Sequence, residues 1–176
     1  MKVRSVCVAA LALALAGCAT NYAAKPPEAI ARAVQIKDSA FDAAVTYVGP
    51  RLQTKKTRGI FTDYQYAQLR SIKDRKTGSV KHQLYIQVNY TGSWRYYQVV
   101  SFKNGHQEAL SVIGRDVSSC TGIGCMYTET LGVDVTEEQL LSGGNSFEVR
   151  ISSKSGHENI VALPENYVTG YFSAIK

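Results

Sequence analysis

The chain is poor in the residues on which most metal and nucleophile chemistry depends. Its 176 residues include three histidines, four cysteines and one tryptophan. A zinc site needs several His, Cys or carboxylate ligands at suitable spacing, and no local spacing of His82, His106 and His157 supplies one. The sequence also lacks a Gly-x-Ser-x-Gly nucleophile elbow, a phosphate-cradling glycine motif and the metal-binding helix of zinc proteases. We therefore expect no metal, no cofactor and no catalytic residue.

The only long apolar run that the sequence offers near its start is too short to cross a membrane. Val6–Ala16 has about eleven residues, whereas a spanning helix needs about 20. Lys2 and Arg4 precede this run, and small residues lead from it to Cys18. A positive start, a short apolar run and small residues before a cleavage point are typical of a secretory signal peptide.

Leu15-Ala16-Gly17-Cys18 resembles a lipobox, the motif of bacterial lipoproteins. The resemblance implies that residues 1–17 are removed, that the Cys18 thiol receives a diacylglycerol, and that the new amino group is acylated. Three acyl chains hold a protein stably to a membrane, whereas one is marginal. Ala19 stands where an aspartate would favour the inner membrane in enterobacterial lipoproteins, so the resemblance implies an outer-membrane anchor facing the periplasm. The alternative is an ordinary signal cleaved by the general peptidase.

Two cysteines remain once Cys7 leaves with the signal and Cys18 is lipidated. Cys120 and Cys125 enclose Thr121-Gly122-Ile123-Gly124, where two glycines allow a sharp turn. In the oxidising periplasm this pattern predicts a disulfide that closes a tight loop. A redox pair is the alternative, but such pairs have two intervening residues and an activating neighbour.

Charge is distributed unevenly along the mature chain. The mature part, 18–176, has 18 basic and 14 acidic residues; 11 basic and two acidic ones lie between Arg51 and His106, and 4 basic and 9 acidic ones follow from Gln107. A basic surface can bind an acidic partner, which in the envelope means a protein, lipopolysaccharide or peptidoglycan, and not nucleic acid. Alternatively, strands of opposite charge pair across a sheet and the remainder is a solvated face.

Hydrophobic alternation predicts a single β-rich periplasmic domain over 29–176, joined to the lipid by a tether over 18–28. Val80–Tyr90 alternates with period two, as a half-buried antiparallel strand does. Further strands are expected over 64–73, 94–102, 107–113, 126–135, 147–151 and 160–163. Asn104-Gly105 predicts a tight hairpin turn, a second hairpin is expected at Thr91-Gly92-Ser93, 29–37 favours a strand, and 55–59 is expected to be a loop.

Two helices are expected among the strands. Thr136-Glu137-Glu138-Gln139 has the capping-box pattern, and Gly143-Gly144 ends that helix. After Pro164, an apolar stripe predicts an amphipathic C-terminal helix that covers a sheet. The predicted fold class is thus mainly β (α+β): an antiparallel sheet or β-sandwich meander with one short helix and a C-terminal helix.

An aromatic cluster surrounds Arg95. Strand parity over 94–97 places Trp94 and Tyr96 in the core and makes Arg95 and Tyr97 a possible binding surface. His82 falls on the buried side of its strand, where a hydrogen bond would satisfy it. Paired carboxylates for a hydrolase could come from Glu129 with Asp134 or Glu108, although nothing else marks them.

The body of the chain carries a second, weaker resemblance. Arg115-Asp116-Val117, the Cys120–Cys125 loop, Tyr127-Thr128-Glu129 and the ending from Leu163 to Phe172 resemble small proteobacterial lipoproteins, a group with no known activity to transfer. The sequence therefore favours an outer-membrane lipoprotein that presents a non-catalytic β module for binding or envelope support. The alternatives are a hydrolase acting on an envelope polymer and an accessory subunit of an envelope complex.

Overall fold

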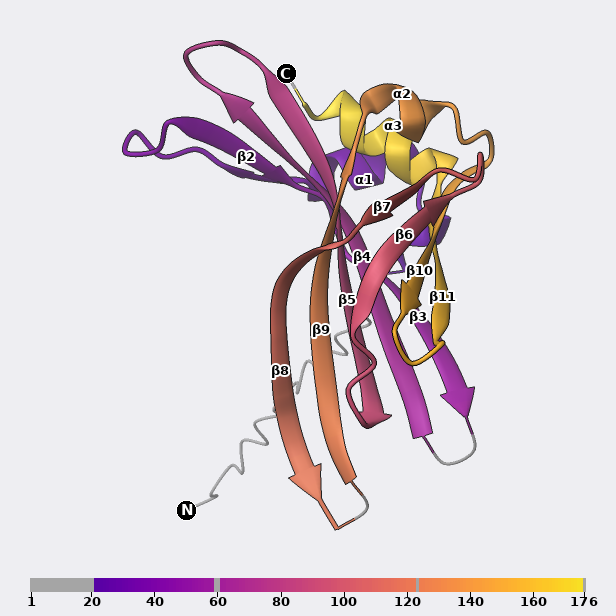
Figure 1. Cartoon of the computed structure of the whole chain (residues 1–176). Coiled ribbons are helices and arrows are strands. Elements are labelled where there is room, and N and C mark those ends of the chain that lie inside the picture. Colours follow the sequence, from indigo (N-terminus) through magenta and orange to yellow (C-terminus); the bar gives the residue numbers. More distant parts are fainter. Residues whose placement is uncertain (1–20, 59–60, 123, 176) are drawn as a thin grey trace, which may run out of the picture.

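The computed structural model describes residues 21–58, 61–122 and 124–175 and contains two antiparallel sheets and a group of short helices (Figure 1). The lipobox and Cys18 lie outside the described residues. The mainly β, α+β fold confirms the predicted class. No helix among the described residues has the length and apolar character needed to cross a membrane.

The larger sheet has seven strands in the order β1-β2-β4-β5-β9-β8, with β3 also paired to β4. Its strands are β1 (Gln35–Lys37), β2 (Ala44–Val48), β3 (Leu52–Arg58), β4 (Phe61–Asp74), β5 (Val80–Gly92), β8 (Ser111–Thr121) and β9 (Gly124–Val135). β2 and β3 occupy the same edge of β4 one after the other, because Gly49-Pro50 interrupts the chain between them.

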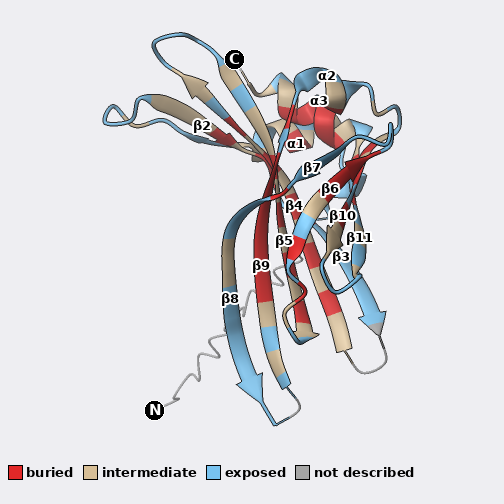
Figure 2. Cartoon of the chain, in the orientation of Figure 1, coloured by how far each residue is buried: buried red, intermediate tan, exposed pale blue. Residues whose placement is uncertain are grey.

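The smaller sheet has four strands in the order β11-β10-β6-β7. Its strands are β6 (Tyr97–Phe102), β7 (Gln107–Ala109), β10 (Ser146–Ser153) and β11 (Glu158–Pro164). This sheet packs on one face of the larger sheet, and the red core of Figure 2 lies between them. That core contains Leu84, Ile86 and Leu131 from the larger sheet and Ile151 and Val161 from the smaller one. We call the covered face of the larger sheet its inner face and the other its outer face.

Four helical segments lie at the ends of the sheets: η1 (Tyr22–Ala24), α1 (Pro27–Ala33), α2 (Glu137–Leu141) and α3 (Glu165–Ser173). The predicted capping box begins α2, since Thr136 Oγ1 accepts from Gln139 N at 3.1 Å and Gln139 Oε1 accepts from Thr136 N at 2.8 Å. α3 packs on α1 so closely that a Cβ on Gly170 would lie 2.4 Å from Pro27 O.

Three local predictions were wrong. Residues 27–33 form α1, because Pro27 opens a helix well and Ile30 is then buried against α3; only Gln35–Lys37 is strand. The expected loop at 55–59 is the end of β3 as far as Arg58, where polar side chains pair with a long neighbouring strand. Thr91-Gly92-Ser93 does not make a hairpin, because β6 joins the smaller sheet.

The predicted tether over 18–28 is partly folded. From Tyr22 onward it packs on the domain: Tyr22 contacts the core, and Asn166 Nδ2 donates to Lys25 O at 2.6 Å and to Ala23 O at 3.2 Å. The folded body of the described chain therefore includes Tyr22, which is four residues after Cys18 in the sequence.

Candidate functional site

The loop Ser93–Tyr96, which leads from β5 of the larger sheet to β6 of the smaller one, is the most unusual segment of the described chain. Tyr96 has φ 57°, the one positive value among the described residues other than glycine. A bulky residue pays a steric penalty in this left-handed region and persists there only when its surroundings fix it. The neighbouring contacts explain how this loop is fixed.

The carboxylate of Glu129, on the inner face of β9, holds the loop. The side chain is fully buried, with 0% of its surface exposed. Its Oε1 accepts from Tyr96 N at 2.9 Å and from Tyr90 Oη at 2.5 Å, and its Oε2 accepts from Tyr97 N at 3.1 Å. A buried carboxylate is tolerated when donors satisfy its lone pairs. Because the amides of Tyr96 and Tyr97 are both donors here, Glu129 holds the backbone on either side of the left-handed Tyr96.

Two arginines complete the buried network. Arg115 Nε donates to Glu129 Oε2 at 2.9 Å, and its guanidinium lies 5.1 Å from the centre of the Tyr96 ring. Arg95 pairs with Asp63 at 2.8 Å while its guanidinium lies 4.0 Å from the centre of the Tyr90 ring. Both charged pairs lie between the two sheets, where breaking one would leave a charge without a partner.

The tyrosines of this network are poor proton donors. Burial, reinforced by the hydrogen bond to Glu129, raises the pKa of Tyr90 far above its usual value. Burial also raises the pKa of Tyr97. Burial alone would lower the pKa of Arg95, but hydrogen bonds and charge from Tyr97 and Asp63 outweigh it and raise the value. These tyrosines and Arg95 therefore offer no group that titrates near neutral pH, and the network acts as a support.

The supported loop presents an aromatic patch, which we define as Trp94, Tyr96 and Tyr127. The Trp94 ring lies 4.7 Å from that of Tyr127 and 5.9 Å from that of Tyr96. Tyr96 is 43% exposed. Tryptophan and tyrosine are enriched among the few residues that supply most of the binding free energy at protein interfaces, so this patch is a candidate contact surface.

The aromatic patch adjoins β8, the last strand of the larger sheet. β8 pairs only with β9, so one whole edge of this eleven-residue strand has no strand partner in the described chain. Val112, Ile113 and Val117 on β8 are 46%, 43% and 51% exposed. Figure 2 shows β8 as largely pale blue beside the red core strands. Long, exposed, apolar edge strands are templates for pairing with another strand.

The surface prediction for Arg95 and Tyr97 was wrong. Arg95 is 5% exposed and Tyr97 is fully buried, whereas Tyr96, expected in the core, points to the surface. The parity argument assumed a regular strand from Trp94, but strand β6 begins only at Tyr97 and Tyr96 is left-handed. The aromatic cluster is thus correctly located, but Arg95 and Tyr97 point inward, Tyr96 points outward, and Trp94 is partly buried.

The predicted disulfide is present. Cys120 and Cys125 are joined, with sulfurs 2.06 Å apart, and the pair closes the tip of the β8–β9 hairpin.

The carboxylates considered for a hydrolase do not converge. Glu129 and Asp134 lie on opposite faces of β9, since their positions differ by an odd number in a regular strand. Glu108, on β7, instead accepts a hydrogen bond from His106 Nε2 at 2.7 Å. No three His, Cys, Asp or Glu side chains of the described residues lie together so that they could hold a metal ion.

His82 belongs to the packing of α3 on the larger sheet. Its Nδ1 lies 2.6 Å from Ser71 Oγ, which in turn lies 2.7 Å from Tyr171 Oη. Ser71 is fully buried, so this serine–histidine pair cannot meet a substrate. Burial lowers the pKa of His82, against a smaller opposing effect of Glu137.

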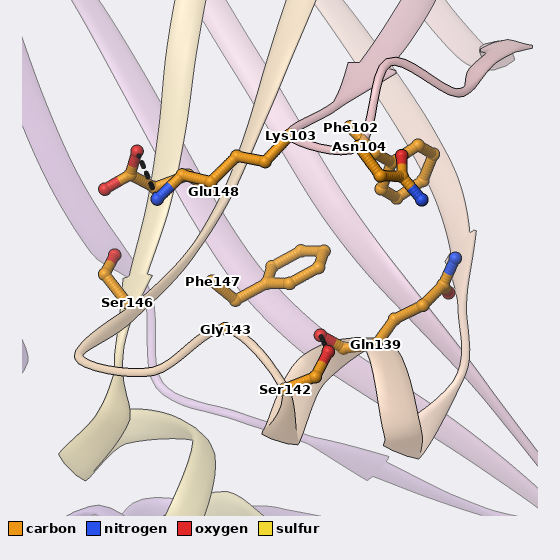
Figure 3. A pocket seen from close by; sticks show the side chains of 9 residues that line it. All are labelled: Phe102, Lys103, Asn104, Gln139, Ser142, Gly143, Ser146, Phe147 and Glu148. Carbon is orange, nitrogen blue, oxygen red and sulfur yellow. Dashed lines mark hydrogen bonds and ion pairs between the residues drawn. The ribbon is translucent and has the colours of Figure 1, made fainter.

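A shallow pocket of about 210 Å³ lies where α2 meets β10 and the β6–β7 turn. Figure 3 shows the Phe147 ring pointing toward the side chains of Gln139 and Asn104, with Lys103 paired to Glu148 at 3.2 Å. Gln139 already serves the α2 capping box. The pocket therefore offers few polar groups that are not engaged.

Sequence reasoning missed the role of Glu129, although a signal was present. Glu129 shares the parity of Tyr127, Leu131 and Val133 on one strand, so the alternation places a carboxylate among core residues. Its ion-pair partner Arg115 lies opposite it on β8, but the amides of Tyr96 and Tyr97 come from a segment 33 and 32 residues away, and no local spacing identifies them.

Comparison of the chain with family models, with curated proteins and with solved structures found no match in any of the three.

Proposed function

We propose that this chain is an envelope lipoprotein, anchored through Cys18 to the outer membrane, whose β domain binds a protein partner and has no catalytic role. The observation that carries the binding proposal is the free β8 edge beside the aromatic patch. The lipobox resemblance supports the anchor, and Cys18 would hold the folded body close to the membrane, since four residues span at most about 14 Å.

The chemistry of the edge favours an extended polypeptide as the partner. The backbone N–H and C=O groups on the free side of β8 are satisfied by an added strand, which gains ladder hydrogen bonds along its length. Val112 and Val117 lie on the inner side and provide apolar contacts for alternate side chains of that strand. Trp94 and Tyr96 provide large rings next to it.

The buried network supports this proposal because it keeps the patch in one conformation. Ordering a loop on binding costs free energy, and a loop that is fixed in advance avoids that cost. Four donors on Glu129 and a strained Tyr96 are a costly arrangement for a loop with no role other than connection.

A capture experiment tests the binding proposal. The lipidated protein, immobilised in detergent, is exposed to solubilised envelope proteins and the captured proteins are identified. Val117→Asp should lose a partner that the unaltered protein retains, because a charge would be buried under the added strand. Ile160→Asp is the matched control, since Ile160 is 58% exposed on β11 of the other sheet. Equal capture by both variants would contradict a β8 interface.

The anchor is tested separately. Cys18→Ser should abolish acylation and release the protein from the membrane fraction, as measured by intact mass and fractionation. A variant that stays fully membrane-bound would contradict the lipobox interpretation.

A further inference from the structure

The outer face of the larger sheet carries cations that no described acid neutralises. Arg51, Lys55 and Arg70 all lie there, and none forms an ion pair with a described residue. At these positions, the excess of basic residues between Arg51 and His106 is therefore not balanced by ion pairs with acidic residues of neighbouring strands. We call the face around these residues the cationic tyrosine face.

Each of these cations lies against a tyrosine ring. The Arg51 guanidinium is 4.3 Å from the centre of the Tyr66 ring, that of Arg70 is 5.0 Å from Tyr85, and the Lys55 ammonium is 5.6 Å from Tyr64. A ring face attracts a cation without removing its charge. The stacks therefore hold the positive groups in place and leave their charge available to a ligand.

Side-chain amides fix the two arginines further. Arg51 Nη2 donates to Gln87 Oε1 at 2.7 Å, and Arg70 Nε donates to Gln83 Oε1 at 2.8 Å. Each bond uses one of the five N–H donors of a guanidinium. The bound oxygens are neutral. Asp134 also lies on this face, but it accepts from Gln83 Nε2 at 2.9 Å and forms no ion pair with Arg70, so both arginines are held in place and keep their charge.

The spacing of the charges indicates an extended ligand. Lys55 pairs with Tyr64, and Arg70 lies six residues farther along β4, about 20 Å at the usual rise per strand residue. Neutral amides lie between the cations, among them Gln68, Gln87 and Asn89. A ligand that matches this pattern carries single negative charges, well separated, with amides and hydroxyls between them.

We propose that the cationic tyrosine face binds peptidoglycan, whose peptide stems carry separated carboxylates and whose glycan carries N-acetyl and hydroxyl groups. Guanidinium groups recognise carboxylates with paired hydrogen bonds, and the amides and tyrosine hydroxyls match the N-acetyl and hydroxyl groups of the glycan. A lipid with densely packed phosphates fits the sparse charges less well. Single-stranded nucleic acid needs free ring faces for base stacking, and here cations occupy them. This site lies on the face opposite the smaller sheet and does not depend on the proposed β8 interface.

Co-sedimentation of the full-length lipidated protein in detergent with purified, protein-free sacculi tests the proposal. The protein should pellet with sacculi at low salt, and conversion of the sacculus carboxylates to methylamides should reduce binding at least tenfold. Equal binding to untreated and amidated sacculi, or no binding to either, would overturn the proposal. Tighter binding to single-stranded DNA than to sacculi would assign the face to another ligand and overturn it as well.

Variants locate the site. Arg51→Gln with Arg70→Gln should weaken binding to untreated sacculi at least about tenfold, since each arginine contributes charge-assisted hydrogen bonds. Lys154→Gln, which removes an exposed charge in the β10–β11 turn, is the matched control and should change binding less than twofold. If Lys154→Gln lost as much binding to sacculi as the double arginine variant, the effect would depend on net charge alone, and this would contradict a binding site on the cationic tyrosine face.

A final variant separates preorganisation from charge. Tyr66→Leu keeps every cation but removes the ring beneath Arg51, and it should weaken binding several-fold. Thermal unfolding of each variant shows that it is folded, and the comparison of native with amidated sacculi, which needs no variant, tests the proposal even where a variant is unstable.

Discussion

Replacing Glu129 by Gln tests whether the buried network maintains the loop at residues 93–96. Gln retains one carbonyl oxygen, so two of the four donors would face an NH₂ group, and Arg115 would lose its negative partner. Breaking a buried pair from one side costs about 3–5 kcal/mol, a large share of the roughly 5–15 kcal/mol that stabilises a domain. At about 2–4 °C per kcal/mol for this size, the melting temperature should fall by roughly 6–20 °C.

The assay is urea and thermal unfolding, with the emission of the single tryptophan as a local probe. Trp94 lies in the supported loop, so its emission should shift to longer wavelength in Glu129→Gln before global unfolding. The control is Glu158→Gln, whose exposed pair with Arg150 at 3.7 Å should contribute less than about 1 kcal/mol. A loss in Glu129→Gln no larger than that of the control, with unchanged emission, would refute the reasoning.

Three other predictions concern the disulfide, the buried histidine and the helix contact. Intact mass should show no free thiol at Cys120 and Cys125 without a reductant, and replacing both by Ser should cost about 2 kcal/mol, because the closed loop is short; two reactive thiols in protein from the periplasm would contradict this. Burial lowers the folded-state pKa of His82, so its contribution to stability is fully present above about pH 6.5, the usual pKa of histidine, and is lost as the pH falls below that value. Between pH 7.5 and 5.0, the free energy of unfolding in urea should therefore fall less in His82→Gln than in the unaltered protein, and an equal fall would contradict the prediction. Gly170→Ala should lower stability by about 1–3 kcal/mol, because the new Cβ meets the Pro27 carbonyl, whereas Thr169→Ala on the exposed side should have little effect; equal melting temperatures would argue against close packing of α1 on α3.

Regular alternation and local capping made much of the fold predictable. β5 has inward apolar residues at every second position from Leu84 to Tyr90, burial alternates along β4 as well, and the capping box of α2 involves residues only three apart. Such signals depend on local geometry alone. The Asn104-Gly105 turn, which links β6 to β7, belongs to the same class.

The candidate site was less predictable because it depends on contacts between distant segments. The orientation of Tyr96 is set by Glu129, 33 residues away in the chain, and no local pattern encodes its positive φ. Likewise, β3 is a polar strand that pairs with β4, so composition alone suggested a loop. Parity predictions fail where tertiary contacts end a strand early, as they do before Tyr97.

Hydrogen exchange at β8 tests the central claim, that the free edge binds a protein strand, most directly. In the unbound protein, the β8 amides that do not face β9 should exchange quickly, since they have no ladder partner. Addition of the captured envelope partner should slow exchange across residues 111–121 and leave the β11 amides unchanged. Unchanged exchange in β8 while the partner is bound would contradict the claim.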